Sequence, residues 1–204
     1  MNIDKLKEAE ANFLQAYPNG FADEAMQTIR KKHNVDKVVA FAQDNLTQAN
    51  CNRPDFIAET LLKIVSRSSM VSRFEKPPFK AFLDALSSPE KEALAYAVEQ
   101  RLFGRKQKGF EQILGLLAHH KIAKWAVISA VPFYYSPKRE VFVKPTTAKG
   151  ILAFLEIPTP RYQSTPSWEF YSGYRNVLTE VRKEVSPSLS PNYAALSGFL
   201  MMSI

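Results

Sequence analysis

Apolar side chains recur every three or four positions along most of this chain, which is the spacing of amphipathic helices. Proline, glycine and capping residues border these stripes. The stripes cover residues 3–17, 38–46, 54–65, 88–103, 110–117 and 171–185. Alternation of apolar and polar residues, the mark of a strand, is convincing only around residues 140–143. The pattern predicts an all-α fold, a multi-helix globular bundle with at most one short extended segment near residues 140–144.

The apolar run at residues 121–131 has a less certain secondary structure. It is too short for its period to separate a buried helix from a strand, and helix is favoured. Further along, Thr146 or Thr147 can cap a brief helix that follows the extended segment.

The Pro77-Pro78 pair marks the expected boundary within the chain. A residue that precedes proline avoids the helical region, so the pair predicts an extended step. A chain of 204 residues is long enough for one hydrophobic core or for two packed subdomains. We therefore expect a single domain over residues 1–204, which can divide into helical subdomains at residues 1–76 and 79–204.

The C-terminus is too apolar to extend into water. Its last six residues include Phe199, Leu200, Met201, Met202 and Ile204. Burial of these side chains is favourable, so we expect this end to dock into the core or across a homodimer interface.

The remaining composition is typical of a soluble, cytoplasmic protein. No stretch approaches the ~18 consecutive apolar residues of a membrane span, so no membrane partner is expected. Cys51 is the only cysteine and has no disulfide partner within the chain. It is expected to be a structural, inert thiol.

Positive charge is concentrated in one quarter of the chain. The formal net charge is +7, and residues 101–150 hold ten Lys and Arg against two Glu. The rest of the chain has 17 basic and 18 acidic residues, so its balance is −1. Charge confined in this way predicts a basic surface, with the ten cations gathered on one patch, and an anionic partner.

Many of these cations fall in polar turns, where they can approach phosphates without distorting a core. The candidate residues for binding nucleic acid or another polyanion are Arg105, Lys106, Lys108, Lys121, Lys124, Lys138, Arg139, Lys144 and Lys149. Phe133, Tyr134 and Tyr135 precede one cluster, and exposed rings beside cations can stack on unpaired bases. These features predict a non-catalytic binding or accessory protein with a basic face. In the competing interpretation, the Lys and Arg side chains only form the solvent-exposed face of a helical layer, and the aromatic residues fill its core.

No catalytic, cofactor or metal-binding motif accompanies the cations. The sequence has no GxSxG elbow and no Walker or GxGxxG phosphate loop. His119 and His120 are adjacent, but neighbouring helical residues point about 100 degrees apart, and the only other histidine is His33. A metal ion needs further ligands, so we predict no metal site and no cofactor.

Two stretches resemble the C-terminal region of a set of uncharacterised bacterial proteins. The stretches are residues 140–157, EVFVKPTTAKGILAFLEI, and residues 166–190, PSWEFYSGYRNVLTEVRKEVSPSLS. The residues that carry the resemblance are Phe142, Lys144, Pro145, Trp168 and Tyr171: a Phe-x-Lys-Pro step before a short helix, then an aromatic-rich helix that begins near a Trp. The resemblance implies a bacterial origin and no particular activity.

Lys144 has a notable position before Pro145, which fixes an extended residue at the start of the expected short helix. A helix N-terminus disfavours a nearby ammonium group unless an anion lies between them. This arrangement predicts a small anion site, which an enzyme with an unrecognised active site could use. A solvated lysine on a tight turn is the other interpretation.

Overall fold

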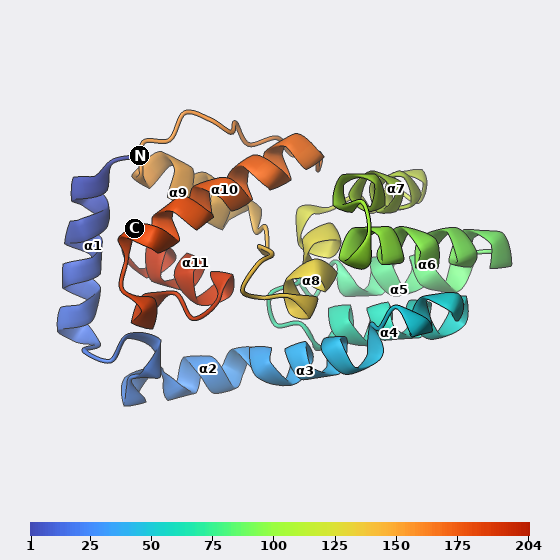
Figure 1. Cartoon of the computed structure of the whole chain (residues 1–204), viewed down its shortest axis with the longest axis horizontal. Coiled ribbons are helices and arrows are strands. Elements are labelled where there is room, and N and C mark those ends of the chain that lie inside the picture. The colour runs from blue at the N-terminus through green and yellow to red at the C-terminus, as the bar shows by residue number, and fades with distance from the viewer.

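The computed structural model shows a chain folded into helices and the segments that connect them (Figure 1). It describes the backbone of residues 1–204 and the side chains of all residues except residue 30. The α-helices are α1 (Ile3–Ala16), α2 (Gln27–His33), α3 (Val35–Asn45), α4 (Pro54–Arg67), α5 (Lys76–Ala85), α6 (Ser88–Phe103), α7 (Lys106–His119), α8 (Trp125–Tyr135), α9 (Pro145–Phe154), α10 (Trp168–Glu184) and α11 (Tyr193–Met202). Short 3-10 helices connect some of them, namely η1 (Gly20–Ala22), η2 (Glu24–Met26), η3 (Ala49–Asn52) and η4 (Pro187–Leu189). Within the described backbone no residue forms a strand, so the predicted all-α, multi-helix fold is confirmed.

The helices form two groups that meet along the segment after α8. In Figure 1, α3 to α8 lie on one side and α1, α9, α10 and α11 on the other. Helices α6 and α7 form the most extensive pair, and α4 and α8 pack against α6. Helix α11 packs against α9 and α10. The segment at residues 136–144 crosses from one group to the other.

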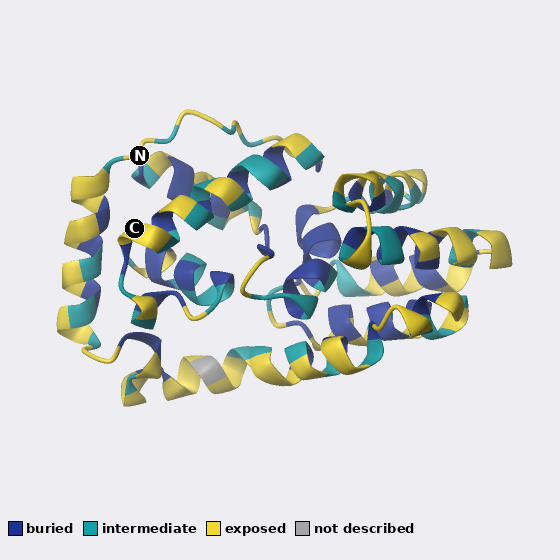
Figure 2. Cartoon of the chain, in the orientation of Figure 1, coloured by how far each residue is buried: buried dark blue, intermediate teal, exposed yellow. Residues whose placement is uncertain are grey.

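Helix α8 lies at the centre of the first group. It contacts α3, α4, α6 and α7, and nearly all of its residues are buried (Figure 2). For the apolar run at residues 121–131, the prediction of a helix is therefore confirmed from Trp125 onward. Across the described chain, no helix combines the length and the apolar character that crossing a membrane would require.

The interpretation of Phe133, Tyr134 and Tyr135 as exposed rings is wrong, and the competing interpretation, in which aromatic residues fill the core, is confirmed for Phe133 and Tyr134. Phe133 and Tyr134 belong to α8 and have no solvent exposure, while Tyr135 is half-buried. The Tyr134 hydroxyl donates to Oγ of Ser68 over 2.9 Å inside the core. The rings are buried because α8 is surrounded by other helices, so they fill the core instead of flanking the cations.

The predicted extended step at the proline pair is also wrong. Helix α5 begins at Lys76 and contains both Pro77 and Pro78 in its first turn. Proline is tolerated there because the first N–H groups of a helix have no intrahelical partner to lose. The division into subdomains at residues 1–76 and 79–204 stays a prediction.

The C-terminal helix docks on the N-terminal one. The rings of Phe13 and Phe199 meet edge to face, with centroids 5.3 Å apart. Phe199 and Leu200 are fully buried, which confirms that the apolar end packs into the core. Met201, Met202 and Ile204 remain exposed. Homodimerisation through this end stays a prediction.

Cys51 is buried in η3, as expected of a structural thiol. Burial, and then the charge of Glu99, raises the pKa of its thiol from 9.0 to about 11. The thiol is therefore protonated at neutral pH, and only the thiolate is a good nucleophile.

Gly109 lets α7 approach α6 closely. A Cβ atom at this position would lie 2.6 Å from the Cα of Arg101 and 2.7 Å from the Ala97 carbonyl oxygen. Both are backbone atoms, so the two helices would have to separate. At Gly115, in the same helix, no described atom outside the neighbouring residues and the nearby helix backbone lies within 4 Å of the corresponding position.

We expect Gly109→Ala to lower the free energy of unfolding by about 1–3 kcal/mol, because the added methyl group forces α6 and α7 apart. Gly115→Ala is the matched control and should raise it by up to about 1 kcal/mol, because alanine favours a helix over glycine. Chemical denaturation of both variants measures the difference. Equal effects at the two positions would contradict the close packing of this helix pair.

Candidate anion-binding face

Glu140 lies at the centre of a buried cluster of charged and aromatic side chains. Its carboxylate is only 3% exposed. Arg101 Nη2 and Tyr171 Oη each donate to Oε2 over 2.8 Å, and Lys106 Nζ donates to Oε1 over 2.8 Å. Arg175 Nη1 lies 3.8 Å from Oε1. One carboxylate thus joins α6, α7 and α10 to the segment that follows α8.

Arg101 is as buried as the carboxylate that it contacts, with 2% of its side chain exposed. Its guanidinium lies 5.6 Å from the Trp168 ring centroid and 5.1 Å from that of Tyr171. Among the described residues, its Nε and Nη1 atoms have no hydrogen-bond partner. Unpaired donors in the interior are costly, so Glu140 and the two ring faces must offset the desolvation of this cation.

The protonation states in this cluster follow from its contacts. Burial by itself raises the pKa of the Glu140 carboxyl, but Arg101 and Lys106 outweigh burial and lower it to about 2. Burial is also the main cause that raises the pKa of the Tyr171 hydroxyl well above its usual range. At neutral pH Glu140 is therefore ionised and Tyr171 donates to it. Three cations share this one carboxylate, which leaves the cluster with excess positive charge.

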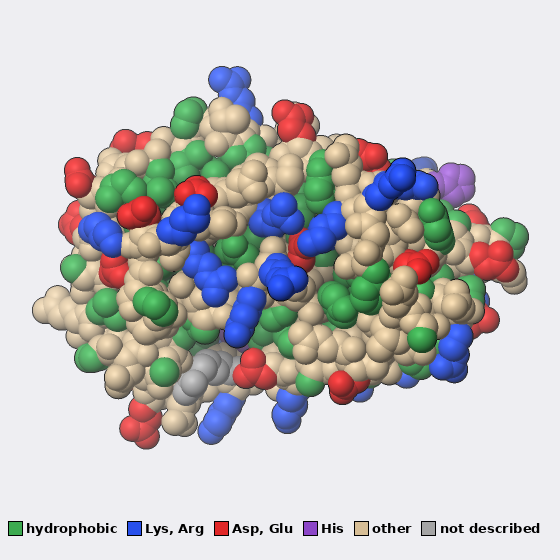
Figure 3. Space-filling view, viewed as in Figure 1, with side chains coloured by type: hydrophobic (Ala, Val, Ile, Leu, Met, Phe, Trp, Pro, Cys, Tyr) green, Lys and Arg blue, Asp and Glu red, His purple; other side chains and the backbone are tan. Residues whose placement is uncertain are grey.

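More cations surround the cluster on its solvent side. Lys138 and Arg139 directly precede Glu140 and are exposed. Arg182 Nη1 donates to the Lys138 carbonyl oxygen over 3.0 Å, which fixes α10 against this loop. Figure 3 shows Lys and Arg side chains gathered over α10 and the segment between α8 and α9.

Lys144 lies at the other end of the same segment. It is exposed and occupies the N-cap position of α9 with an extended backbone, φ −100° and ψ 120°. Burial, then Lys32, then Lys144 lower the pKa of His33, which places Lys144 near the end of α2. We call the surface formed by Lys106, Lys138, Arg139, Lys144, Arg175 and Arg182 the central basic face.

The capping prediction for the threonines is wrong. Helix α9 begins at Pro145, before Thr146 and Thr147, because proline suits the first helical position. The extended conformation of Lys144 before the helix is confirmed. An anion site between Lys144 and this helix stays a prediction.

The structure brings Lys106, Lys138, Arg139 and Lys144 to the central basic face, with Arg105 beside it at the exposed N-cap of α7. Arg101, the tenth cation of the basic quarter, was expected on the same patch. That expectation is wrong, because Arg101 is buried against Glu140 and the two aromatic rings.

The other predicted residues have no contact with Glu140 among the described residues. Lys121 follows the end of α7, a helix of 14 residues, and so lies about 20 Å from Lys106 at its start. Lys108 Nζ lies 3.3 Å from the Tyr96 hydroxyl, and Lys149 Nζ lies 5.5 Å from the Tyr162 ring centroid. The last of them, Lys124, is the N-cap of α8. These cations do not join the cluster around Glu140.

Sequence reasoning missed Glu140, Arg175 and Arg182. Glu140 had a detectable signal, because it is one of two acids among residues 101–150 and stands between Arg139 and an apolar run. An isolated acid in that position indicates an internal partner for a cation. The two arginines on α10 are seven positions apart, which places them on one helix face.

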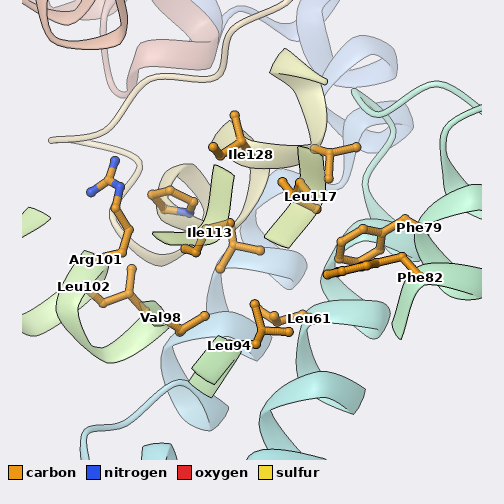
Figure 4. Close-up of a pocket in the computed structure, with 13 residues that line it drawn as sticks. Leu61, Phe79, Phe82, Leu94, Val98, Arg101, Leu102, Ile113, Leu117 and Ile128 are labelled. Atoms are coloured by element: carbon orange, nitrogen blue, oxygen red, sulfur yellow. The ribbon is translucent and has the colours of Figure 1, made fainter. Parts of the chain in front are cut away.

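A small internal cavity of about 30 Å³ lies close to this cluster, among α4 to α8 (Figure 4). Its walls are apolar except for Arg101, whose guanidinium points away from the other labelled side chains. A space of this size holds no more than a water molecule or two. It is a packing defect of the core and too small for an organic ligand.

A larger groove of about 610 Å³ runs beside α10. Its lining includes Met1, Pro160 and the carboxylates of Glu169 and Glu180, and among the described residues it contains no Lys or Arg. Neither cavity is lined by Lys144. The central basic face is therefore open surface, outside both cavities.

No protein-family model matches this chain, and neither a curated protein nor a solved structure matches it. These comparisons add nothing to the resemblance of residues 140–157 and 166–190 to uncharacterised bacterial proteins.

We expect stability to fall in acid because of Glu140. Its pKa is lowered from 4.5 to about 2 in the folded chain, so folding favours the ionised form. This difference contributes about 3 kcal/mol at neutral pH, and the contribution is lost as the pH falls from about 5 to about 2. The free energy of unfolding, measured across this range, should follow that decline.

In the Glu140→Gln variant, this part of the decline of stability in acid should be absent. At pH 7 its free energy of unfolding should be lower by about 3–5 kcal/mol, because Arg101 stays buried without its anionic partner. Glu180→Gln is the surface control. Glu180 and its partner Lys183 are both exposed, so loss of this ion pair should change the free energy of unfolding very little. An unchanged acid decline in Glu140→Gln would show that the carboxylate is not held ionised by its neighbours.

Proposed function

We propose that this protein binds nucleic acid through the central basic face, as a binding or accessory protein without catalysis. One observation carries the proposal: both oxygens of the acid at the centre of the face, Glu140, are already engaged by internal cations. Among the described residues, the outer cations Lys138, Arg139, Lys144 and Arg182 form no ion pair. The face therefore presents positive charge that the protein itself does not neutralise.

The arrangement of these cations suits phosphate groups. Arg182 is held by the Lys138 carbonyl oxygen and Arg175 by Glu140, so two guanidinium groups are positioned by α10 before any ligand binds. Lys138 and Arg139 extend from a loop that can follow the ligand. Cations of this kind make the contacts that fix a nucleic acid by its backbone.

Phosphate contacts favour binding that is independent of sequence. Phe133 and Tyr134 are buried, so these rings cannot stack on bases beside the cations. Contacts to phosphates carry no direct information about base identity. We therefore expect similar affinities for different sequences of the same length, with an acidic protein surface as the alternative ligand to be tested in parallel.

We expect the affinity for duplex DNA to fall steeply with salt, because each phosphate contact releases condensed counterions. Three to five contacts give a slope of log K against log salt between about −2.7 and −4.5. Reversing Lys138, Arg139 and Lys144 to Glu should weaken binding at least about tenfold and flatten the slope. Fluorescence anisotropy at several salt concentrations measures both quantities.

The matched control reverses Lys121, Lys124 and Lys149, which are exposed on other elements. It changes the net charge by the same amount and should keep most of the affinity. Equal losses in the two triple variants would assign binding to net charge and not to the central basic face. Absence of binding by the unmodified protein at about 50 mM salt would refute nucleic acid as the ligand.

A further inference from the structure

The far end of the α6–α7 hairpin carries a second cluster of polar side chains. Glu90, in the first turn of α6, lies beside His119 and His120 at the end of α7. Each of the three offers one ligand atom, and these atoms all lie within 4.8 Å of one another. In Figure 1 this end of the hairpin is at the outer edge of the molecule, and Figure 3 shows a histidine side chain over it. The cluster is therefore accessible from solvent.

The two histidines converge because the helix ends between them. His119 is the last residue of α7, whereas His120 leaves the helix with φ −90° and ψ 10°. Lys121 then adopts a left-handed conformation, φ 59°, and its N–H donates to the Ala118 carbonyl oxygen over 2.9 Å. The expected divergence of neighbouring helical residues does not apply here, and the imidazole centroids are 5.1 Å apart.

The Glu90 carboxylate is held in place by the capping box of α6. The Ser87 backbone N–H and hydroxyl donate to Oε2 over 2.9 and 2.6 Å. This leaves Oε1 directed toward His120, with 3.7 Å between Oε1 and Nε2. A hydrogen-bonded partner of this kind orients a carboxylate as outer groups do in metal sites.

His120 presents an unused nitrogen at this point. Its Nε2 is buried and has no hydrogen-bond partner among the described residues, because 3.7 Å is too long for one. That separation is close to the roughly 3.4 Å between two ligand atoms on a tetrahedral ion with bonds of about 2.1 Å. The Phe82 ring packs edge to face on this imidazole and fixes its plane. The C-terminus of α7 also favours a nearby cation.

We propose that Glu90, His119 and His120 bind a divalent transition-metal ion of the zinc class. Two imidazole nitrogens and one carboxylate oxygen are a donor set that suits Zn²⁺, and a fourth position stays open to water. The His119 side chain is exposed, so its ring is free to turn toward a bound ion. The sequence predicted no metal site because Glu90 is far from the histidines along the chain. The inference is independent of the proposed nucleic-acid binding.

The test uses the full chain without a histidine tag, titrated with Zn²⁺ in a calorimeter and with Co²⁺ in a spectrophotometer. We expect one ion per chain, visible Co²⁺ absorption of a tetrahedral site, and a higher melting temperature with Zn²⁺. Glu90→Gln keeps the capping box, which accepts Gln, but removes the anionic ligand. His119→Ala changes an exposed residue. Each variant should bind Zn²⁺ at least about tenfold more weakly.

His33→Ala is the control, because His33 lies away from this cluster on α2, with its ring 2.9 Å from Ser69 Oγ. It should bind Zn²⁺ as the unmodified protein does. Melting of all variants without metal verifies that they fold. The proposal is overturned if the unmodified chain takes up no stoichiometric Zn²⁺, if Glu90→Gln and His119→Ala retain full affinity, or if His33→Ala weakens binding equally.

Discussion

An ionised carboxylate that water cannot reach must keep its cations, and Glu140 imposes this constraint on the whole structure. Its partners come from α6, α7 and α10, so its position is defined only when these helices have assembled. The segment at residues 136–144 carries Glu140 across the junction between the two helix groups of Figure 1. Removal of either Glu140 or Arg101 would leave the other charge buried without a partner. The resulting loss of stability is larger than the stability that the intact ion pair contributes.

This internal network also explains the charge of the surface above it. Arg101, Lys106 and Tyr171 hold both carboxylate oxygens inside the cluster, and among the described residues Glu140 forms no ion pair with the cations further out. Among the described residues, the outer lysines and arginines therefore have no acidic partner. The α6–α7 hairpin carries separate chemistry at its two ends, with cations around Glu140 at one end and imidazoles beside a carboxylate at the other.

The sequence predicted the helices well because the spacing of apolar residues reports which face of a helix is buried. It could not report which helix covers that face. Phe133 and Tyr134 therefore looked available to a ligand, although α8 is enclosed by other helices. The same limit hid the contact between Glu140 and Arg101, which lie far apart in the chain. The rule that proline interrupts a helix failed at Pro77-Pro78. Both prolines lie in the first turn of α5, where proline is tolerated, although it would break the interior of a helix.

The most direct test of the central claim is a titration of the Glu140 carboxyl carbon, followed by NMR in the folded, ¹³C-labelled protein between pH 7 and pH 2. The account predicts that this resonance stays at its ionised position down to about pH 3, because the pKa is lowered to about 2. A midpoint near the ordinary value of 4.5 would contradict it. Glu140 would then not be the buried, fully paired carboxylate around which the helices and the basic face are organised.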